Sequence, residues 1–492
     1  MRILSSIRTD KLFESGHLKQ DLGRKSVRGG ITTMSAECAG FIINLIRTMI
    51  LARLLIPDDF GIICMAMVVV GFAGMFKDAG LSMATVQKDE INERQISTLF
   101  WCNVTLSIFL GLCVLVSSPL VSIFYKKTEL TAVTAALSIS FILSGLIIQH
   151  QALMRRHMMF TQLAYINIVT QIFSLIVAAI LASIGWRYWA LVISIMAQAL
   201  LNIVMIFLYC PWFPQKPLKG TGVRQMLKFG GHLTGFNFLN YFITVFDQAI
   251  VGKYAGATEL GYYTKAYGLL MTPLNNIKGP ITAVLIPAMS RISYKQPRYA
   301  NYYEQINSLL SILTTPMVIF LMWNAKKFIT FFLGADWLAA APIFQGFCVG
   351  GIIQPLAGLT GCVAISAGKP DMLLRWRIIS FWIYPVCFLL GFWHNGIVGA
   401  SYGRSIGLWF TFFPCLIYII KGTSIMFSNL CIIIARSFII AAIANLTVYF
   451  TFLGNNIIIG AIAILIATFT LNELLPGKKI GREIVGKIFT KK

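Results

Sequence analysis

Long apolar segments recur along almost the whole chain and restrict what it can fold into. From near residue 29 to near residue 475, runs of about 20 mostly apolar residues follow one another, with gaps too short to hold a folded domain. A helix of about 20 residues crosses the roughly 30 Å of hydrocarbon in a bilayer. The runs lack the alternating polarity of barrel strands, so they predict helices. The sequence therefore indicates an all-α integral membrane protein with about fourteen transmembrane helices.

Composition agrees, because 57% of the 492 residues are hydrophobic and only 12% are charged, which nearly excludes a water-soluble fold. We expect the spans at 29–55, 60–86, 97–123, 131–153, 160–184, 188–210, 226–253, 259–289, 303–325, 338–366, 372–393, 396–421, 429–453 and 456–475.

The placement of basic residues predicts the topology. If both termini are cytoplasmic, most of the 41 Lys and Arg residues fall in the tails and in the alternate loops on the inside, among them the pair Arg155 and Arg156. This is the positive-inside bias, and it favours an even number of crossings. The net charge of +23 therefore indicates topology and attraction to anionic membrane lipid, with no nucleic-acid partner.

The sequence predicts no processing signal and no metal site. The first 28 residues are polar and lack an apolar signal-peptide core, so we expect the first span to act as the targeting signal. The ten cysteines lie almost wholly inside spans, where a thiol is ordinarily a small hydrophobe. No CxxC pair or His/Cys cluster occurs. We expect no metal, no cofactor and no catalytic residue.

The chain also shows a weak internal repeat. Residues 47–67 align without a gap with residues 247–267, and both copies run from the end of one span through a short loop into the next. Six spans separate the copies, so the two halves share one orientation, related by an axis along the membrane normal. The last two spans have no counterpart. Matched pairs include Ile50 and Ile250, Arg53 and Lys253, Asp59 and Glu259, Gly61 and Gly261, and Ala66 and Ala266.

Polar residues form stripes on the repeated helices. Ionisable groups at membrane depth cost about 2.5 kcal/mol or more, so they persist where they pair or line a hydrated cavity. The stripes therefore predict two six-helix halves around a central polar cleft. They comprise Glu37, Gly40, Asn44, Arg47 and Thr48 on the first helix, Asn237, Asn240, Thr244, Asp247 and Gln248 at the same offsets on the seventh, Lys265, Gly268, Thr272, Asn275 and Asn276 on the eighth, and Lys77 and Asp78 on the second.

An ordered set of motifs resembles the Wzx-type polysaccharide transporters. The turn ARLLIPDDFG at 52–61 and DAGL at 78–81 look like their first two helices, and DQAIVGKY at 247–254 with LGYY at 260–263 like their seventh and eighth. FLGADW at 332–337 is similar to the entry to their tenth helix, GKPD at 368–371 to the loop after it, and NGIVGA at 395–400 to the entry to the twelfth. The resemblance covers roughly residues 25–425 and favours the colanic-acid-exporter-like (WzxC-like) subgroup.

The resemblance implies a function and a fold. This family belongs to the MOP superfamily, with the MATE drug exporters and the lipid II flippases. It implies a non-enzymatic flippase of the bacterial inner membrane that moves undecaprenyl-diphosphate-linked oligosaccharides by alternating access, for exopolysaccharide, capsule or O-antigen synthesis. Polysaccharide polymerases and glycosyltransferases are implied partners, and coupling to H⁺ or Na⁺ stays open. The implied MATE-like fold divides into a cytoplasmic basic tail (1–28), an N-lobe (29–210), a cytoplasmic linker (211–225), a C-lobe (226–421), spans thirteen and fourteen (422–475) and a second cytoplasmic basic tail (476–492).

The candidate site consists of the charged and polar groups of the expected cleft. The resemblance carries over Arg53, Asp78, Asp247 and Lys253, while the stripes, helical periodicity and the aromatic residues of the same helices supply the others. Arg and Lys suit a diphosphate because their N–H groups can donate to phosphate oxygens. The diphosphate candidates are Arg47, Arg53, Lys77, Lys253, Lys265 and Lys278. Candidates for a coupling site or a cleft ion pair are Glu37, Asp78 and Asp247, and candidates for sugar contacts are Asn44, Asn237, Asn240, Asn275, Tyr241 and Tyr262.

Structural interpretations stand beside these functional ones. Arg47 could simply pair with Asp247, its repeat mate. Arg53 and Lys253 lie at expected helix ends, where snorkelling to the interface is the default. Asp58 is more typical of a turn or helix cap than of a ligand, as is Asp59. The tyrosines at 262, 263 and 267 could serve helix packing as well as sugar stacking.

Two other functions remain alternatives. A MATE-like ion-coupled exporter of small cations shares the fold, but its cleft should favour carboxylates. A membrane glycosyltransferase or polymerase would be expected to carry a long extracytoplasmic loop with catalytic carboxylates or His, whereas every outside connection here is short.

Overall fold

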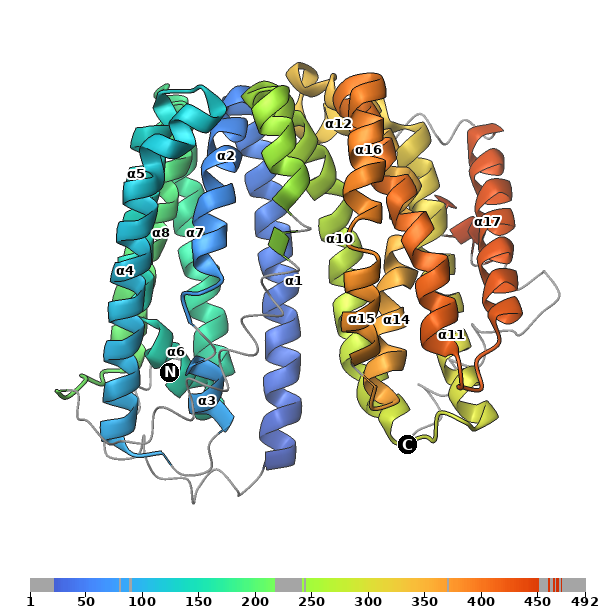
Figure 1. The fold of residues 1–492 in the computed structure, drawn as a ribbon, viewed down its shortest axis with the longest axis horizontal. Helices are drawn as coiled ribbons and strands as arrows, with labels where there is room; N and C mark the ends of the chain where they lie inside the picture. Colours follow the sequence, from blue (N-terminus) through green and yellow to red (C-terminus); the bar gives the residue numbers. More distant parts are fainter. Residues whose placement is uncertain are drawn as a thin grey trace. The chain divides into compact units, whose positions relative to one another are not determined.

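The computed structural model describes residues 22–78, 81–87, 91–216, 241–242, 245–369 and 371–450, together with 459–460, 463–464, 466–468 and 470. Within these residues the secondary structure is helical, with no strand (Figure 1). Ten helical stretches among them are long and apolar enough to cross a membrane, and one, Asp371–Ile420, covers two of the expected spans. The expected class, an all-α membrane protein, is confirmed. The chain divides into two compact units, Met1–Gly261 and Tyr262–Lys492, which are described separately.

Six of the ten candidate membrane spans lie in the first unit, one at each of the first six expected spans. The helices are α1 (Leu22–Leu54), α2 (Pro57–Gly74), α3 (Leu81–Gln87), α4 (Glu93–Tyr125), α5 (Glu129–Gly145), α6 (Ile148–Arg156), α7 (Phe160–Ser183) and α8 (Tyr188–Tyr209). A further helical stretch covers 245–254, and the first residues of α10 (Ala257–Ser290) also fall in this unit.

The second expected span is shorter than the sequence indicated. We expected a helix over 60–86, but α2 ends at Gly74 and the separate short helix α3 begins at Leu81. The cause is local, because the Asp78 carboxylate accepts hydrogen bonds from the backbone nitrogen of Ser82, at 2.9 Å, and from the Ser82 hydroxyl. A side-chain acceptor at this point satisfies the first backbone donors of a new helix.

Two of the expected spans are broken in the middle. In the first unit α5 stops at Gly145 and α6 starts at Ile148, and in the second unit α13 (Ala340–Gly351) gives way to α14 (Gln354–Ser366). These are the fourth and tenth expected spans, which the internal repeat makes counterparts. Breaks at corresponding positions of two repeats are typical of transporters whose binding groups lie near broken helices.

The second unit contains the rest of α10 and the later helices. These are α11 (Pro297–Trp323), α12 (Ala325–Leu333), the short 3₁₀ helix η4 (Ala335–Trp337), α13, α14, α15 (Asp371–Ile379), α16 (Ile383–Ile420) and α17 (Phe427–Phe450). Within α16 the backbone turns at Asn395 and Gly396, whose φ is +54°. A positive φ suits glycine, so the expected entry to the twelfth span is the break between two halves of α16.

Candidate functional site

The helix α6 buries most of its residues, whereas Gln151 and Arg155 line a cavity. Ala152, Leu153 and Met154 are fully buried, and Leu153 and Met154 belong to a core cluster with α4 and α8. The His150 ring Nε2 lies 3.0 Å from the Trp212 carbonyl oxygen. Gln151 and Arg155 are four residues apart, hence on one helical face, and both line a cavity.

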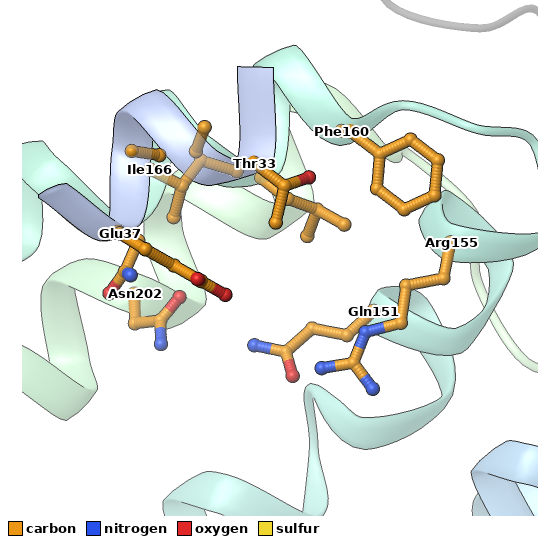
Figure 2. Close-up of a pocket in the computed structure, with 11 residues that line it drawn as sticks. Thr33, Glu37, Gln151, Arg155, Phe160, Ile166 and Asn202 are labelled. Carbon is orange, nitrogen blue, oxygen red and sulfur yellow. The ribbon is translucent and has the colours of Figure 1, made fainter. Parts of the chain in front are cut away.

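This polar cavity lies inside the first unit and has a volume of about 410 Å³. Helices α1, α6, α7 and α8 contribute to it. Figure 2 shows that the side chains of Glu37, Gln151 and Arg155 point into the same space. The volume lies within the roughly 300–1,000 Å³ range of small-molecule sites. The lining residues are Thr33, Ala36, Glu37, Gln151, Arg155, Phe160, Leu163, Ala164, Ile166, Asn167 and Asn202.

The polar stripe of α1 continues from this cavity along α7 and α8. A Cβ on Gly40 would lie 3.5 Å from the Gln171 amide of α7, and the Arg47 guanidinium donates to the Ser194 hydroxyl of α8 at 3.5 Å. The stripe therefore faces other helices of its own unit at these positions. Arg47 and Asp247 make no ion pair among the described residues.

The starts of α2 and α10 meet in a reciprocal contact, which we name the helix-start junction and define by residues 57–61 and 257–261. A Cβ on Gly61 would overlap the Ala257 carbonyl oxygen, and a Cβ on Gly261 would overlap that of Pro57. Gly61 and Gly261 are repeat mates, and so are Pro57 and Ala257, each pair being 200 residues apart in the sequence. Close backbone approach therefore requires glycine at both positions.

Charged residues surround the junction. The Asp58 carboxylate lies 2.8 Å from the Lys127 ammonium and 4.0 Å from the Arg187 guanidinium, and it accepts a hydrogen bond from the Thr258 hydroxyl at 3.2 Å. The Asp59 carboxylate lies 3.2 Å from Arg187 and accepts from the Ile56 backbone nitrogen at 3.3 Å. Asp59 thus makes a helix-cap contact, whereas the contacts of Asp58 are ion pairs and a hydrogen bond to side chains far away in the sequence.

Several predicted site residues make local contacts. The Lys253 ammonium donates to the Phe124 carbonyl and lies over its ring. The Tyr241 hydroxyl donates to the Val68 carbonyl at 2.7 Å, and the Tyr262 hydroxyl donates to that of Asp336 at 3.2 Å. Both tyrosine hydroxyls are therefore engaged by backbone in this structure.

The remaining predicted residues are scattered over both units. Asp247 is fully buried, and its carboxylate accepts from the Gln248 backbone nitrogen at 3.1 Å. A Cβ on Gly358 of α14 would overlap the Lys278 side chain, so this lysine lies against the piece that follows the break. Asn44, Arg53 and Asn275 are exposed, whereas Lys77 and Lys265 are half-buried. Asn237 and Asn240 lie outside the described residues.

Of all the predicted site residues, the structure places Glu37 alone in the described polar cavity. Sequence reasoning missed its neighbours Gln151, Arg155 and Asn202, because Arg155 was taken as a topology signal in a loop. The sequence did contain a signal for these residues. Gly145 can interrupt a helix, and Gln151 and Arg155, which follow it, lie about one helical turn apart. Arg404 was also missed, and its guanidinium lies 4.0 Å from the centre of the Tyr267 ring. Among the described residues no group of three possible metal ligands comes together.

Comparison with known proteins gives the family. The model of the family described as polysaccharide biosynthesis protein matches residues 50–342, more than half of the chain. The chain is 28% identical over 307 residues to the teichuronic acid biosynthesis protein TuaB of Bacillus subtilis, covering 62% of this chain and 64%, just under two thirds, of that protein. It is 23% identical over 393 residues to the lipopolysaccharide biosynthesis protein WzxC of Escherichia coli, covering 78% of each chain.

Solved structures give the fold. The lipid II flippase MurJ, in an inward closed conformation, matches with a TM-score of 0.71 at 14% identity, covering 91% of this chain and 99% of that one. A multidrug resistance MATE family transporter of the MOP superfamily, inward-facing, matches with a TM-score of 0.60 at 14% identity, covering 80% and 99%. The resemblance is confirmed: the chain belongs to the polysaccharide biosynthesis protein family, and it is a multi-pass membrane protein with the fold of the MurJ and MATE structures.

Proposed function

We propose that this protein is a flippase that moves undecaprenyl-diphosphate-linked oligosaccharides from the cytoplasmic to the periplasmic leaflet of a bacterial inner membrane, with both termini cytoplasmic. Alternating access carries the sugars across, and charged groups inside the membrane meet the diphosphate. The translocated oligosaccharide is used for exopolysaccharide, capsule or O-antigen synthesis. The observation that carries the proposal is a hydrophilic cavity, with Glu37 and Arg155, among membrane helices of a polysaccharide biosynthesis family.

The chemistry of the cavity supports this substrate class. An ionisable group at membrane depth costs about 2.5 kcal/mol or more, so Glu37, within the apolar stretch Thr32–Leu54 of α1, calls for a function or a partner. Amides and a carboxylate exchange hydrogen bonds with sugar hydroxyls as water does. The positive-inside bias puts the Arg155 end of α6 on the cytoplasmic side, where the oligosaccharide is assembled.

Arg47 and the cations of α10 remain candidates for the diphosphate. The pyrophosphate carries about two negative charges that must leave the headgroup region, and guanidinium groups are weakly hydrated and donate in pairs. Arg47 lies on the same stripe as Glu37, and Lys278 lies against the broken tenth span. Asp247 and Glu37 are the acids through which H⁺ or Na⁺ coupling would act.

A MATE-like exporter of small molecules is the second candidate, because a MATE transporter shares the fold at a TM-score of 0.60. The residues predicted for the cleft include more cations than acids, which favours an anionic cargo over a cationic one. Accumulation of lipid-linked intermediates in cells distinguishes the two functions, since a drug exporter handles none.

The test is a strain that lacks the protein. Lipid-linked oligosaccharides are extracted, their length is determined, and their leaflet is found with a membrane-impermeant reagent. We expect complete repeat units held on the cytoplasmic side and released by the wild-type gene. Units one sugar short would point to a transferase, complete units on the periplasmic side to a polymerase, and no accumulation to the small-molecule exporter.

A further inference from the structure

The two halves of the chain differ in one connection between membrane spans. In the first half, residues 126–128 join α4 to α5 directly. In the second half, the counterpart connection from α11 to α13 is longer, and its residues 324–339 form α12 and η4 (Figure 1). The first half has no such helix at this point. The structural reason for the addition must therefore be sought in the segment 324–339 itself.

Both connections carry a pair of lysines at the repeat spacing of 200 residues. Lys126 and Lys127 lie between α4 and α5, and the second pair lies in the first turn of α12. The Lys127 ammonium lies 2.8 Å from the Asp58 carboxylate, so its charge is used inside the first unit. Lys326 and Lys327 are both exposed, and among the described residues neither lies within 4.0 Å of a carboxylate. The second pair therefore presents its charge outward.

One face of α12 fixes the helix to the second unit. Its buried residues recur at helical spacing, and they are Ala325, Phe328, Ile329 and Leu333. The centre of the Phe328 ring lies 5.2 Å from that of the Phe344 ring of α13. After the helix, Gly334 takes a φ of +105°, which suits glycine, and Trp337 of η4 is fully buried. The packing therefore holds the other face of α12 in a fixed orientation.

The outward face combines cations with large apolar side chains. Lys327 and Phe331 lie four residues apart, hence on one face of α12, and Phe331 is 41% exposed. Trp323 before the helix is 52% exposed, and Leu338 after η4 is 49% exposed. Ammonium groups beside aromatic rings match a phospholipid, because its phosphate is an anion and its acyl region is apolar.

The place of the segment in the chain also favours a lipid. Pro297–Trp323 and Ala340–Ser366 are both candidate membrane spans, so the connection between them lies at a membrane surface. Trp side chains are enriched there, and lysines extend to the headgroups. The segment contains two lysines and one acid, Asp336, so its net charge is positive and attracts anionic lipid. Lipid headgroups already surround such a site, whereas a soluble partner would have to displace them.

We propose that α12 and η4 form a binding site for an anionic phospholipid. The lipid phosphate lies on Lys326 and Lys327, and the glycerol and first acyl carbons lie against Trp323 and Phe331. With both termini cytoplasmic, this site is in the extracytoplasmic leaflet, where the positive-inside bias leaves few basic residues. The bound lipid holds the connection between the ninth and tenth spans at the membrane surface. The site is independent of the transported cargo.

The test uses the full-length protein in vesicles of phosphatidylcholine and phosphatidylglycerol. One lipid at a time carries a photoreactive group near its glycerol. After digestion with a protease that does not cut at lysine, mass spectrometry quantifies the label on residues 323–339. At equal amounts, we expect phosphatidylglycerol to label this segment more than phosphatidylcholine, by about fivefold for each lysine. Lys327→Gln should lower this preference about fivefold, and adding Lys326→Gln should remove the rest.

The first half of the chain provides the matched control. Lys126, the repeat mate of Lys326, is exposed at the end of α4. Lys126→Gln removes one positive charge from the same side of the membrane and should leave the labelling of 323–339 unchanged. Lys327→Arg keeps the charge and should keep the preference. High salt should weaken the preference in the wild-type protein, because it screens exposed charges. Thermal midpoints verify that each variant is folded.

Four results would overturn the proposal. Equal labelling by the two lipids in the wild-type protein would show that the segment does not select an anion. A preference that survives in the double variant would place the anion elsewhere. Absence of label from both lipids would show that water or another chain covers this face. Displacement of phosphatidylglycerol by a far smaller amount of undecaprenyl phosphate, dependent on Lys327, would assign the face to the lipid carrier.

Discussion

Charged side chains lie beside two places along α8 in opposite circumstances. Beside its first residue, Arg187 lies 3.2 Å from the Asp59 carboxylate, at a junction where backbone touches backbone. Farther along the helix, about 22 Å from Arg187 at 1.5 Å per residue, Asn202 lines the polar cavity. Glu37 and Arg155 also line this cavity, and the space of the cavity separates their charges. Paired charges with close packing indicate a structural role, whereas separated charges around a space indicate binding.

The largest expected effect concerns the packed end. Gly61→Ala puts a Cβ into the Ala257 carbonyl, and such overpacking costs about 1–3 kcal/mol. In an ordinary helix the same change stabilises by up to about 1 kcal/mol. We expect a lower thermal midpoint for Gly61→Ala. Gly74→Ala, on the same helix with open space around its position, should leave the midpoint unchanged or raise it. Equal midpoints for the two variants would show that the junction is not tightly packed.

The next effect concerns the cavity. Glu37→Gln keeps the shape and removes the anion, so a group that accepts sugar hydroxyls becomes a weaker acceptor. We expect the rate of translocation to fall about tenfold with little change in thermal midpoint. Glu129→Gln, at the exposed start of α5, removes the same charge away from the cavity and serves as the control. A large drop in the thermal midpoint of Glu37→Gln, alongside the slower translocation, would mean that Glu37 has a structural role.

Asn202 should separate stability from function. Asn202→Leu replaces an unsatisfied buried acceptor with an apolar group of similar size, which relieves a cost of about 1–3 kcal/mol. We expect a thermal midpoint that is unchanged or higher, together with slower translocation. The two readouts are taken on the same preparation. A lower midpoint would show that the Asn202 oxygen already has a partner.

The smallest effect concerns the ion pairs at the junction. Asp58→Asn removes attraction to Lys127 and Arg187 but can still accept from Thr258. Partly exposed pairs contribute about 0.2–1 kcal/mol and are screened by salt. We expect a small drop in midpoint that shrinks at high salt. Asp371→Asn, whose pair with Arg375 is 61–70% exposed, should show less. A drop that is independent of salt would contradict the electrostatic account.

The sequence predicted the features that depend on long-range pattern. Long apolar runs located most of the membrane helices, and the 200-residue repeat matched Gly61 with Gly261, each of which lies against the backbone of the other's helix start. The same repeat matched positions 58 and 258, and those side chains share a hydrogen bond. Residues that pack backbone against backbone leave a trace in sequence because only glycine fits.

The cavity could not be predicted because it depends on local breaks in helices. Hydropathy treats the stretch from Glu129 to Arg156 as one span, whereas the chain bends at Leu146 and Ile147 and then directs Arg155 into the first unit. Periodicity placed Glu37 on a polar face but not the helices opposite it. Partners from α6, α7 and α8 are set by tertiary packing, which a single helical stripe does not encode.

Reconstitution tests the central claim most directly. The purified protein is placed in liposomes with an undecaprenyl-diphosphate-linked oligosaccharide, and a membrane-impermeant reagent that modifies the sugar reports which leaflet holds it. We predict that the protected half of the lipid becomes accessible in the presence of the protein, and that the double variant Glu37→Gln with Arg155→Ala slows this at least tenfold. If liposomes that contain correctly folded wild-type protein expose the lipid no faster than protein-free liposomes, the account is contradicted.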